Sequence, residues 1–193
     1  MEKGRLTAFS DGVIAIIITI MVLELKAPHE PSLQGLLKLV PVLLSYTISF
    51  VIVAIYWINH HHLLSTAEHV NGRILWANIH LLFWMSLIPW ASAYAGENHG
   101  ASLAVALYGG LSTACSGAFL LLRCAIFTKL RADSRGARFH QAAVRKNILS
   151  MSLMALSAPL AFVSVPLAVL VILFPPVMHF MPDRRLESPE EEK

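Results

Sequence analysis

The chain has 193 residues, of which 56% are hydrophobic and only 14% are charged, and its mean hydropathy is +0.62. A soluble domain carries about 25% charged residues, so this composition excludes a soluble globular protein and indicates a one-domain integral membrane protein. The 15 basic residues barely exceed the 12 acidic ones, so the pI near 9.0 gives no argument for a nucleic-acid partner.

Six segments are predicted to cross the membrane, because a transmembrane helix needs about 20 mostly apolar residues. Four are separate runs, at residues 6–25, 36–64, 73–94 and 101–127, and the second is long enough to include an interfacial turn. The stretch 147–180 holds the fifth and sixth, with a turn near Pro159 and Pro166, so one or both are predicted to be short or tilted. Residues 1–182 therefore form one six-span domain, and the charged tail 183–193 is predicted to be disordered.

Lysine and arginine determine the predicted orientation, because they are enriched in the cytoplasmic loops of membrane proteins. They precede the first span, lie between the second and third and between the fourth and fifth, and follow the sixth. The opposite side carries only Lys26 and Lys38, which flank the loop APHEPSLQG. Both termini are therefore predicted to be cytoplasmic.

This topology places polar residues of the first three spans at one depth, near the cytoplasmic surface. Ionisable groups within a span are costly and normally pair with one another. We therefore predict a buried network of hydrogen bonds and ion pairs that ties the three spans together. Its predicted members are Arg5, Phe9, Ser10, Asp11, Trp57, His60, His61, Asn78 and His80.

The histidines of the second span also admit a metal site or a catalytic site. Consecutive helical residues are about 100° apart, so His60, His61 and His62 cannot all face one metal ion. A zinc or di-iron site would need an i, i+4 spacing with carboxylates nearby. The pattern therefore predicts no metal and no enzyme chemistry. It favours a structural network that can respond to pH, because histidine titrates near neutrality.

The first span carries a second face, directed away from Ser10 and Asp11. At 100° per residue, an arc about 100° wide collects a glycine, a hydroxyl and large apolar side chains. This face consists of Phe9, Gly12, Ile16, Thr19, Ile20 and Leu23, with Arg5 near its centre line. Such a face can line a pore or meet lipid or another helix, and periodicity taken alone favours the second interpretation.

The fourth span repeats small residues every four positions, at Gly109, Thr113 and Gly117. This small-xxx-small pattern is typical of helices that pack closely. It predicts a packing face, either within one subunit or between subunits.

The start of the first span, RLTAFSDGVIAII, resembles the Arg-x-x-x-Phe-Ser-Asp signature of the transmembrane-protein-175 family of potassium channels, in its bacterial form. YWINHHHLL in the second span and NIHLLFWMSLIPW in the third resemble that family's Trp-x-x-His-His and Asn-x-x-x-Leu-Phe segments. The likeness extends to Trp90, and beyond that it covers only the topology. It implies an all-α fold with six helices per subunit, assembled as a homotetramer in the bacterial inner membrane, whose first helices line a central pore.

The resemblance also implies which residues line that pore. The family lacks the Thr-Val-Gly-Tyr-Gly carbonyl filter of ordinary potassium channels, and this sequence lacks it too. The family's constriction is a ring of large aliphatic side chains five residues after the motif aspartate. A hydroxyl layer follows three residues later, and another aliphatic ring four further on. These positions are Ile16, Thr19 and Leu23 here, and they lie on the same face of the first span as Ile20.

These observations predict a passive cation channel with a modest preference for potassium, whose only implied ligand is the permeant ion. Aliphatic rings carry no charge and offer no carbonyl, so they exclude hydrated ions by size or close by dewetting. A proton- or ion-coupled transporter that uses Asp11 and the histidines of spans two and three is the main alternative. A membrane enzyme and a structural subunit of another complex are further alternatives.

Overall fold

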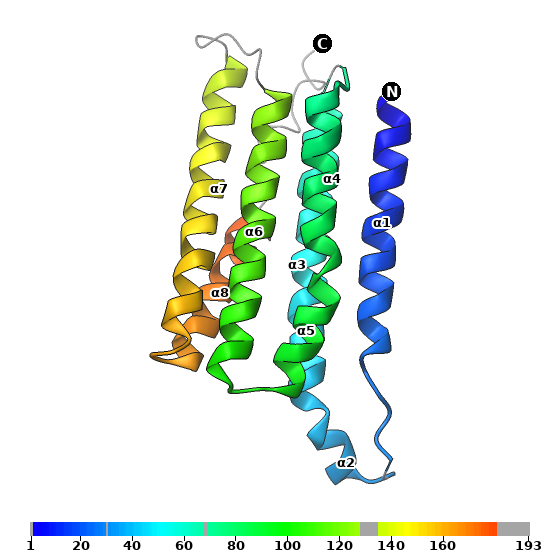
Figure 1. The fold of residues 1–193 in the computed structure, drawn as a ribbon, viewed down its shortest axis with the longest axis vertical. Helices are drawn as coiled ribbons and strands as arrows, with labels where there is room; N and C mark the ends of the chain where they lie inside the picture. Colours follow the sequence, from blue (N-terminus) through cyan, green and yellow to red (C-terminus); the bar gives the residue numbers. More distant parts are fainter. Residues whose placement is uncertain (1, 30, 68, 128–134, 181–193) are drawn as a thin grey trace, which may run out of the picture.

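The computed structural model describes residues 2–29, 31–67, 69–127 and 135–180, and within them the regular secondary structure is all helical. The helices run up and down in one bundle (Figure 1). They are α1 (Lys3–Leu23), α2 (Leu33–Lys38), α3 (Val40–Ser65), α4 (Gly72–Ser86), α5 (Ile88–Glu97), α6 (Ser102–Ile126), α7 (Arg135–Leu160) and α8 (Val165–Phe180).

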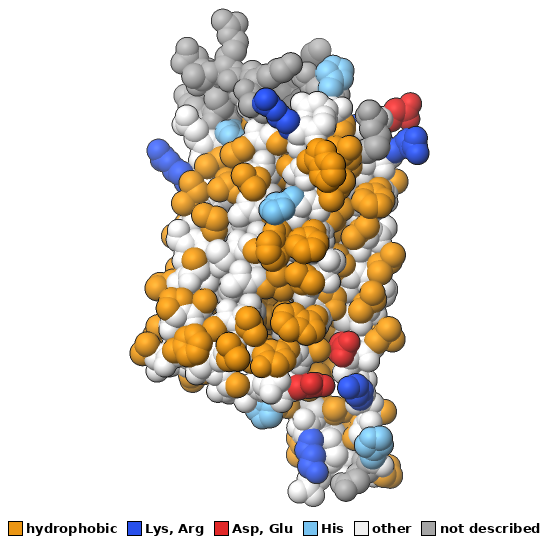
Figure 2. Space-filling view, in the orientation of Figure 1, with side chains coloured by type: hydrophobic (Ala, Val, Ile, Leu, Met, Phe, Trp, Pro, Cys, Tyr) orange, Lys and Arg blue, Asp and Glu red, His pale blue; other side chains and the backbone are white. Residues whose placement is uncertain are grey.

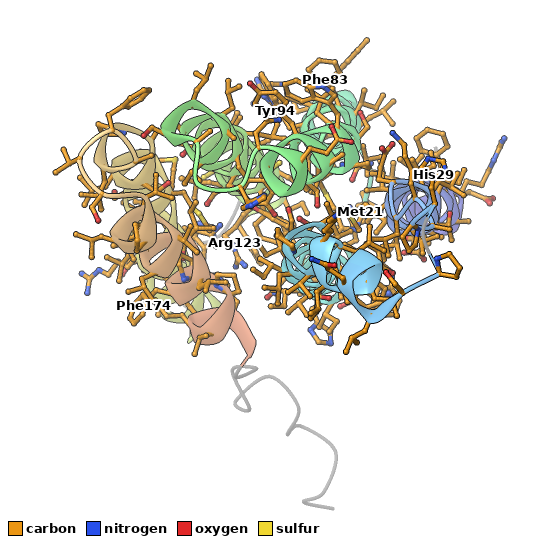
Figure 3. The ribbon with its side chains drawn as sticks, turned by 90° about the horizontal axis from the view of Figure 1, so that it is seen from below. Met21, His29, Phe83, Tyr94, Arg123 and Phe174 are labelled. Atoms are coloured by element: carbon orange, nitrogen blue, oxygen red, sulfur yellow. The ribbon has the colours of Figure 1, made fainter. Side chains whose placement is uncertain are left out.

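Helix α1 lies at one edge of the bundle, where it packs against α3, α4 and α5. Helices α7 and α8 lie at the opposite edge, and α6 packs between α4 and α7. Figure 3 looks along the bundle and shows Met21 directed from α1 toward its neighbours, while Phe174 of α8 lies at the far side. The starts of α1, α4 and α7 share one end of the bundle with the ends of α3 and α6 (Figure 1).

Two predicted spans are each built from two helical pieces. The second consists of α2 and α3, which meet at Leu39. The short helix α2 lies where the sequence suggested an interfacial turn. The third consists of α4 and α5, which meet at Leu87. Pro41 and Pro89 lie in the first turns of α3 and α5, where a missing backbone N–H is tolerated, and each marks the point where a new helix begins.

Four helical segments of the described chain are long and apolar enough to cross a membrane, namely α1, α3, the segment Gly72–Glu97 and α6. Helix α8 is a shorter apolar helix. The fifth span was expected to begin at Asn147, but α7 begins at Arg135, inside the segment expected to be a basic linker. Arginine, alanine, lysine and glutamine are good helix formers, so the helix continues beyond the apolar part. Six crossings remain a prediction, and the tail 183–193 lies outside the described residues.

The surface fits an apolar environment. Hydrophobic side chains cover the length of the face drawn in Figure 2, and charged side chains gather at its two ends. Large side chains such as Trp76 and Phe83 are more than half exposed. A soluble protein rarely exposes so continuous an apolar surface, so the bundle is an integral membrane protein.

The small residues of α6 pack within the subunit, against α7. A side chain at Gly109 would collide with the hydroxyl of Ser157, and one at Gly117 would meet the sulfur of Met151 at 3.5 Å. Gly110, one residue on, has open space around it. Gly109 and Gly117 therefore have the first of the two predicted roles, which is close packing between helices of one chain.

Candidate functional site

Three buried polar side chains connect α1, α3 and α4 near the predicted cytoplasmic end. The amide nitrogen of Asn78 donates to the hydroxyl of Ser10 at 2.9 Å, and its amide oxygen lies 2.6 Å from Nε2 of His60. All three side chains are fully buried. This group, the Ser10–Asn78–His60 chain below, joins residues that are 68 and 18 positions apart in the sequence.

The direction of these hydrogen bonds follows from their last acceptor. The Ser10 hydroxyl donates to the backbone carbonyl of Leu6 at 2.9 Å, and a carbonyl can only accept. Ser10 therefore accepts from the amide nitrogen of Asn78, which turns the amide oxygen of Asn78 toward His60. Nε2 of His60 must then carry the proton. Nδ1 of His60 is buried and has no hydrogen-bond partner among the described residues, so the neutral imidazole fits this site best.

Asp11 lies beside this chain but is bonded separately. Its carboxylate accepts a hydrogen bond from Nε1 of Trp57 at 2.9 Å, so a second contact links α1 to α3. Asp11 is half-buried and Trp57 is 42% exposed. Within the described residues, no hydrogen bond joins Asp11 to the Ser10–Asn78–His60 chain. The carboxylate is thus held by a single neutral donor at the edge of the bundle.

Four of the predicted network members lie outside these contacts. Arg5 and Phe9 are exposed, and neither makes a hydrogen bond or ion pair to a described residue. His61 is exposed and contacts the ring of Trp57, while exposed His80 accepts a hydrogen bond from Trp84 of its own helix at 3.2 Å. The rotation of each helix explains this result. His61 is about 100° from His60, and His80 is about 200° from Asn78 around the helix axis. When His60 and Asn78 point into the bundle, His61 and His80 must therefore point out of it.

The face of α1 that was predicted to line a pore, called the α1 stripe below, lies on the exposed side of its helix. Phe9 is 57% exposed, Ile16 58%, Ile20 44% and Leu23 74%, and Gly12 and Thr19 are exposed as well. The opposite side of α1 is buried, through Leu6, Ser10, Ile14, Ile17 and Met21. Helix α1 therefore has one face inserted into its own subunit and one face available to something outside it.

Thr19 is the only hydroxyl on this exposed face. Its Oγ1 donates to the carbonyl of Ala15 or of Ile16, each at 3.0 Å. Because the hydroxyl proton is used within the helix, the exposed oxygen can offer only its lone pairs to an outside group. A hydroxyl held in this way can accept a hydrogen bond or contact a cation, and it has no proton left to donate.

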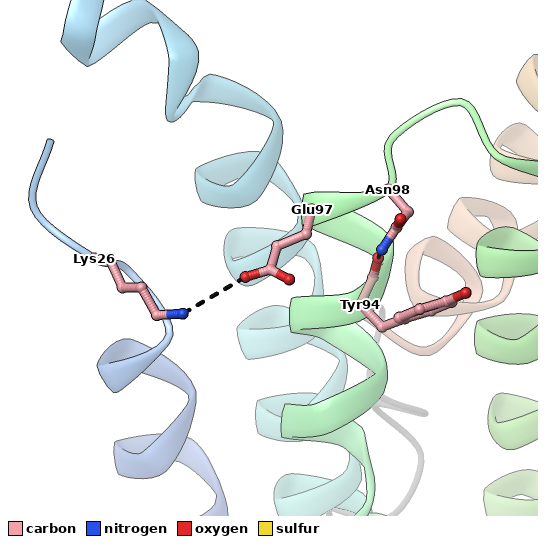
Figure 4. A network of polar contacts seen from close by, with 4 residues as sticks. All are labelled: Lys26, Tyr94, Glu97 and Asn98. Carbon is pink, nitrogen blue, oxygen red and sulfur yellow. Dashed lines mark hydrogen bonds and ion pairs between the residues drawn. The ribbon is translucent and has the colours of Figure 1, made fainter.

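At the other end of α1, a groove of about 720 Å³ separates the helix from α5. Its walls include Ile16 and Ile20 of the stripe and Trp90 of α5. Nζ of Lys26 lies 3.8 Å from the carboxylate of Glu97 at this end, as Figure 4 shows. Both side chains are more than half exposed, so this ion pair contributes little to stability.

Two further contacts between spans were not predicted. Ser49 lies 2.8 Å from the hydroxyl of Tyr108, and Ser45 donates to the carbonyl of Ser92 at 2.7 Å. Serine in an apolar helix commonly bonds its own backbone, so no signal in the sequence distinguishes these two. No cluster of three or more metal-binding side chains occurs in the part of the chain that the structure describes.

These features define a helical membrane protein in which a first helix, braced by buried polar contacts, presents an apolar face outside its own subunit. Comparisons with known proteins identify the class more closely. A family model described as the endosomal/lysosomal potassium channel TMEM175 matches residues 5–89. A potassium channel from Chryseobacterium sp. (strain P1-3) is 42% identical over 97% of both chains.

A potassium channel from Streptomyces collinus is 33% identical, over 86% of this chain and 85% of its own. The crystal structure of a lysosomal potassium-selective channel TMEM175 homolog from Chamaesiphon minutus is similar with a TM-score of 0.83 and 28% identity. It covers 93% of this chain and 96% of that one. The chain belongs to the TMEM175 family, and it is therefore a membrane ion channel and not an enzyme.

Proposed function

We propose that this chain is the subunit of a passive, potassium-preferring channel, assembled as a homotetramer of six-span subunits. Four copies of α1 surround the pore, and Ile16, Thr19, Ile20 and Leu23 line it. Potassium is the permeant ion, and both termini face the cytoplasm of a bacterial cell whose inner membrane holds the channel. The potassium channels similar to this chain over nearly its whole length support the choice of ion.

The observation that carries this proposal is the two-sided character of α1. One side is locked into the subunit by Ser10, and the other exposes Ile16 and Leu23. A ring of four Ile16 side chains offers neither charge nor hydrogen bonds, so ions pass it only when it is wide enough to stay wet. Thr19, three residues further, then offers one outward-facing hydroxyl oxygen per subunit to a partly dehydrated ion.

The buried contacts support the same arrangement, because they hold α1 at one rotation. A shift by one residue would turn the stripe by about 100° and move Ile16 off the pore axis. The alternative of a coupled transporter would need titratable groups joined in a relay. Asp11 is instead bonded to Trp57, apart from the Ser10–Asn78–His60 chain.

The experiment is potassium flux into liposomes that contain only this protein, driven by a potassium gradient. A passive channel gives potassium flux that needs no second ion. This flux runs down the potassium gradient, in the same direction as the flux that a potassium ionophore produces. Absence of flux from correctly assembled protein would point to a structural subunit. Flux that saturates and depends on a second ion would point to a transporter.

A further inference from the structure

A second pocket lies between α3, α6, α7 and α8, apart from the α1 stripe. Its wall is mainly apolar, through residues such as Ile52, Ile55, Phe119 and Met154, and polar side chains are set into it. The pocket is a cavity of about 60 Å³. The polar side chains that line it are Tyr56, Asn59, Ser116, Asn147, Ser150 and His179. No aspartate or glutamate is among the residues that line the cavity.

Asn147 is the least satisfied polar group at this site. Only 6% of it is exposed, yet its amide makes no hydrogen bond to any described residue. The fully buried Asn78, in contrast, has both ends of its amide bonded to protein. A polar group that leaves water without a new partner costs free energy, so the amide of Asn147 favours a small polar ligand in the pocket that it lines.

Ser116 shows the same feature on the facing helix. It is 6% exposed and its hydroxyl has no hydrogen-bond partner in the described part of the chain. Ser150, which also lines the cavity, instead donates to the carbonyl of Lys146 at 2.9 Å, the usual arrangement for serine in a helix. Ser116 and Asn147 thus present polar atoms to one small space from two different helices.

Helix α8 carries two consecutive prolines at the same pocket. Pro175 and Pro176 lie within α8 and line the cavity. A proline has no N–H, so the carbonyls of Val171 and Ile172 lose the donors that a regular helix would give them. In an apolar environment, ordered water or side chains must satisfy such carbonyls.

We propose that this cavity is a water-binding site, occupied by about two molecules since each takes about 30 Å³ in the liquid. Water fits the lining because it donates and accepts, as the amide of Asn147 and the hydroxyl of Ser116 both require. It would bridge the polar groups that α6 and α7 present to the pocket. The lining contains no carboxylate to balance a cation.

The test is water-edited solid-state NMR on the full-length protein in lipid bilayers, labelled with ¹⁵N at asparagine. The chain has five asparagines, and Asn78→Gln and Asn147→Gln assign the two side-chain signals that are compared. Magnetisation from water should reach the amide of Asn147, which is 6% exposed, severalfold faster than that of Asn78, which is fully buried and bonded to protein. Equal, slow transfer to both would overturn the proposal.

A filled cavity provides the second measurement. Ser116→Val removes one polar group and adds carbon to the cavity, so transfer to Asn147 should fall toward the rate of Asn78. Ser112→Val is the matched control, because Ser112 is a buried serine of the same helix that does not line the cavity. Unchanged transfer in Ser116→Val would overturn this site. Slow transfer with an Asn147 signal that shifts when choline replaces potassium would overturn water in favour of a bound cation.

Discussion

The amide of Asn78 in α4 donates a hydrogen bond to the hydroxyl of Ser10 in α1, and neither side chain is exposed. This single bond relates the rotation of the first helix to the packing of the third predicted span. Turning α1 by one residue would move Ser10 by about 100° and break the bond. The same turn would move Ile16 by the same angle, so the buried contact and the exposed stripe are set together.

Asn78→Leu should destabilise the assembled protein. It leaves the Nε2–H of His60 without its acceptor, at about 1–3 kcal/mol for an unsatisfied buried donor, while the hydroxyl of Ser10 keeps its bond to the carbonyl of Leu6. The thermal midpoint of the oligomer, followed by size-exclusion chromatography after heating, measures this loss. His80→Leu is the matched control, because His80 lies on the same helix but is exposed. An equal midpoint for the two variants would contradict a bracing role for Asn78.

Asp11→Asn separates a channel from a transporter. The substituted amide keeps an oxygen that can accept from Trp57, so the half-buried site should lose no more than about 1 kcal/mol. Assembly should therefore persist in either case. A channel should still conduct, because Asp11 lies off the α1 stripe, whereas a relay would lose its titrating carboxylate. Size-exclusion chromatography with liposome flux tests this, and an intact oligomer without flux would favour the transporter.

The sequence predicted the first four spans closely because continuous apolar runs in a bilayer must be helical. The first was expected at 6–25 and is Lys3–Leu23, and the fourth was expected at 101–127 and is Ser102–Ile126. The start of α7 at Arg135 could not be predicted in this way, because hydropathy reports the apolar part of a helix and not its solvated end.

The polar site shows a similar division between depth and rotation. Topology predicts that the polar groups of spans one to three share a depth, and Ser10, His60 and Asn78 are in contact. Whether His60 or His61 points inward depends on how α3 is rotated, and that rotation is set by the packing of all its neighbours. A single sequence does not contain this information, so exposed Arg5, His61 and His80 were grouped with the buried residues.

Gly109→Ala should weaken the contact between α6 and α7. The added methyl group would collide with the hydroxyl of Ser157, at a cost of about 1–3 kcal/mol for overpacking. Gly110→Ala is the matched control, since nothing lies near that position. Alanine favours a helix over glycine by about 1 kcal/mol, so Gly110→Ala should be neutral or stabilising. Thermal midpoints that do not differ between the two would contradict the close packing.

Ile16→Asn should raise ion flux and weaken discrimination among cations, because a polar ring at the constriction stays wet. Potassium and sodium flux into liposomes measures both effects. Val22→Asn is the control, since Val22 is 45% exposed on the same helix but lies about 120° from the stripe position of Ile16. An Ile16→Asn protein that assembles and conducts like the parent would remove Ile16 from the constriction.

Thr19→Val tests the outward-facing hydroxyl. Valine keeps the shape of threonine but removes the only oxygen that a side chain of the α1 stripe offers to an ion. We expect the channel to remain open, with a reduced ratio of potassium to sodium permeability, because a partly dehydrated ion loses one neutral ligand from each subunit. Reversal potentials under bi-ionic conditions measure this ratio directly.

Thr47→Val provides the comparison for Thr19→Val. Thr47 of α3 is also exposed and also donates to a carbonyl of its own helix, that of Leu43, at 2.8 Å. Both substitutions therefore remove the same local hydrogen bond, and only one of them alters the stripe. A permeability ratio that falls for Thr19→Val and not for Thr47→Val assigns the effect to the pore. A fall of the same size in both, or in neither, would exclude Thr19 from ion selection and leave discrimination to the aliphatic ring of Ile16.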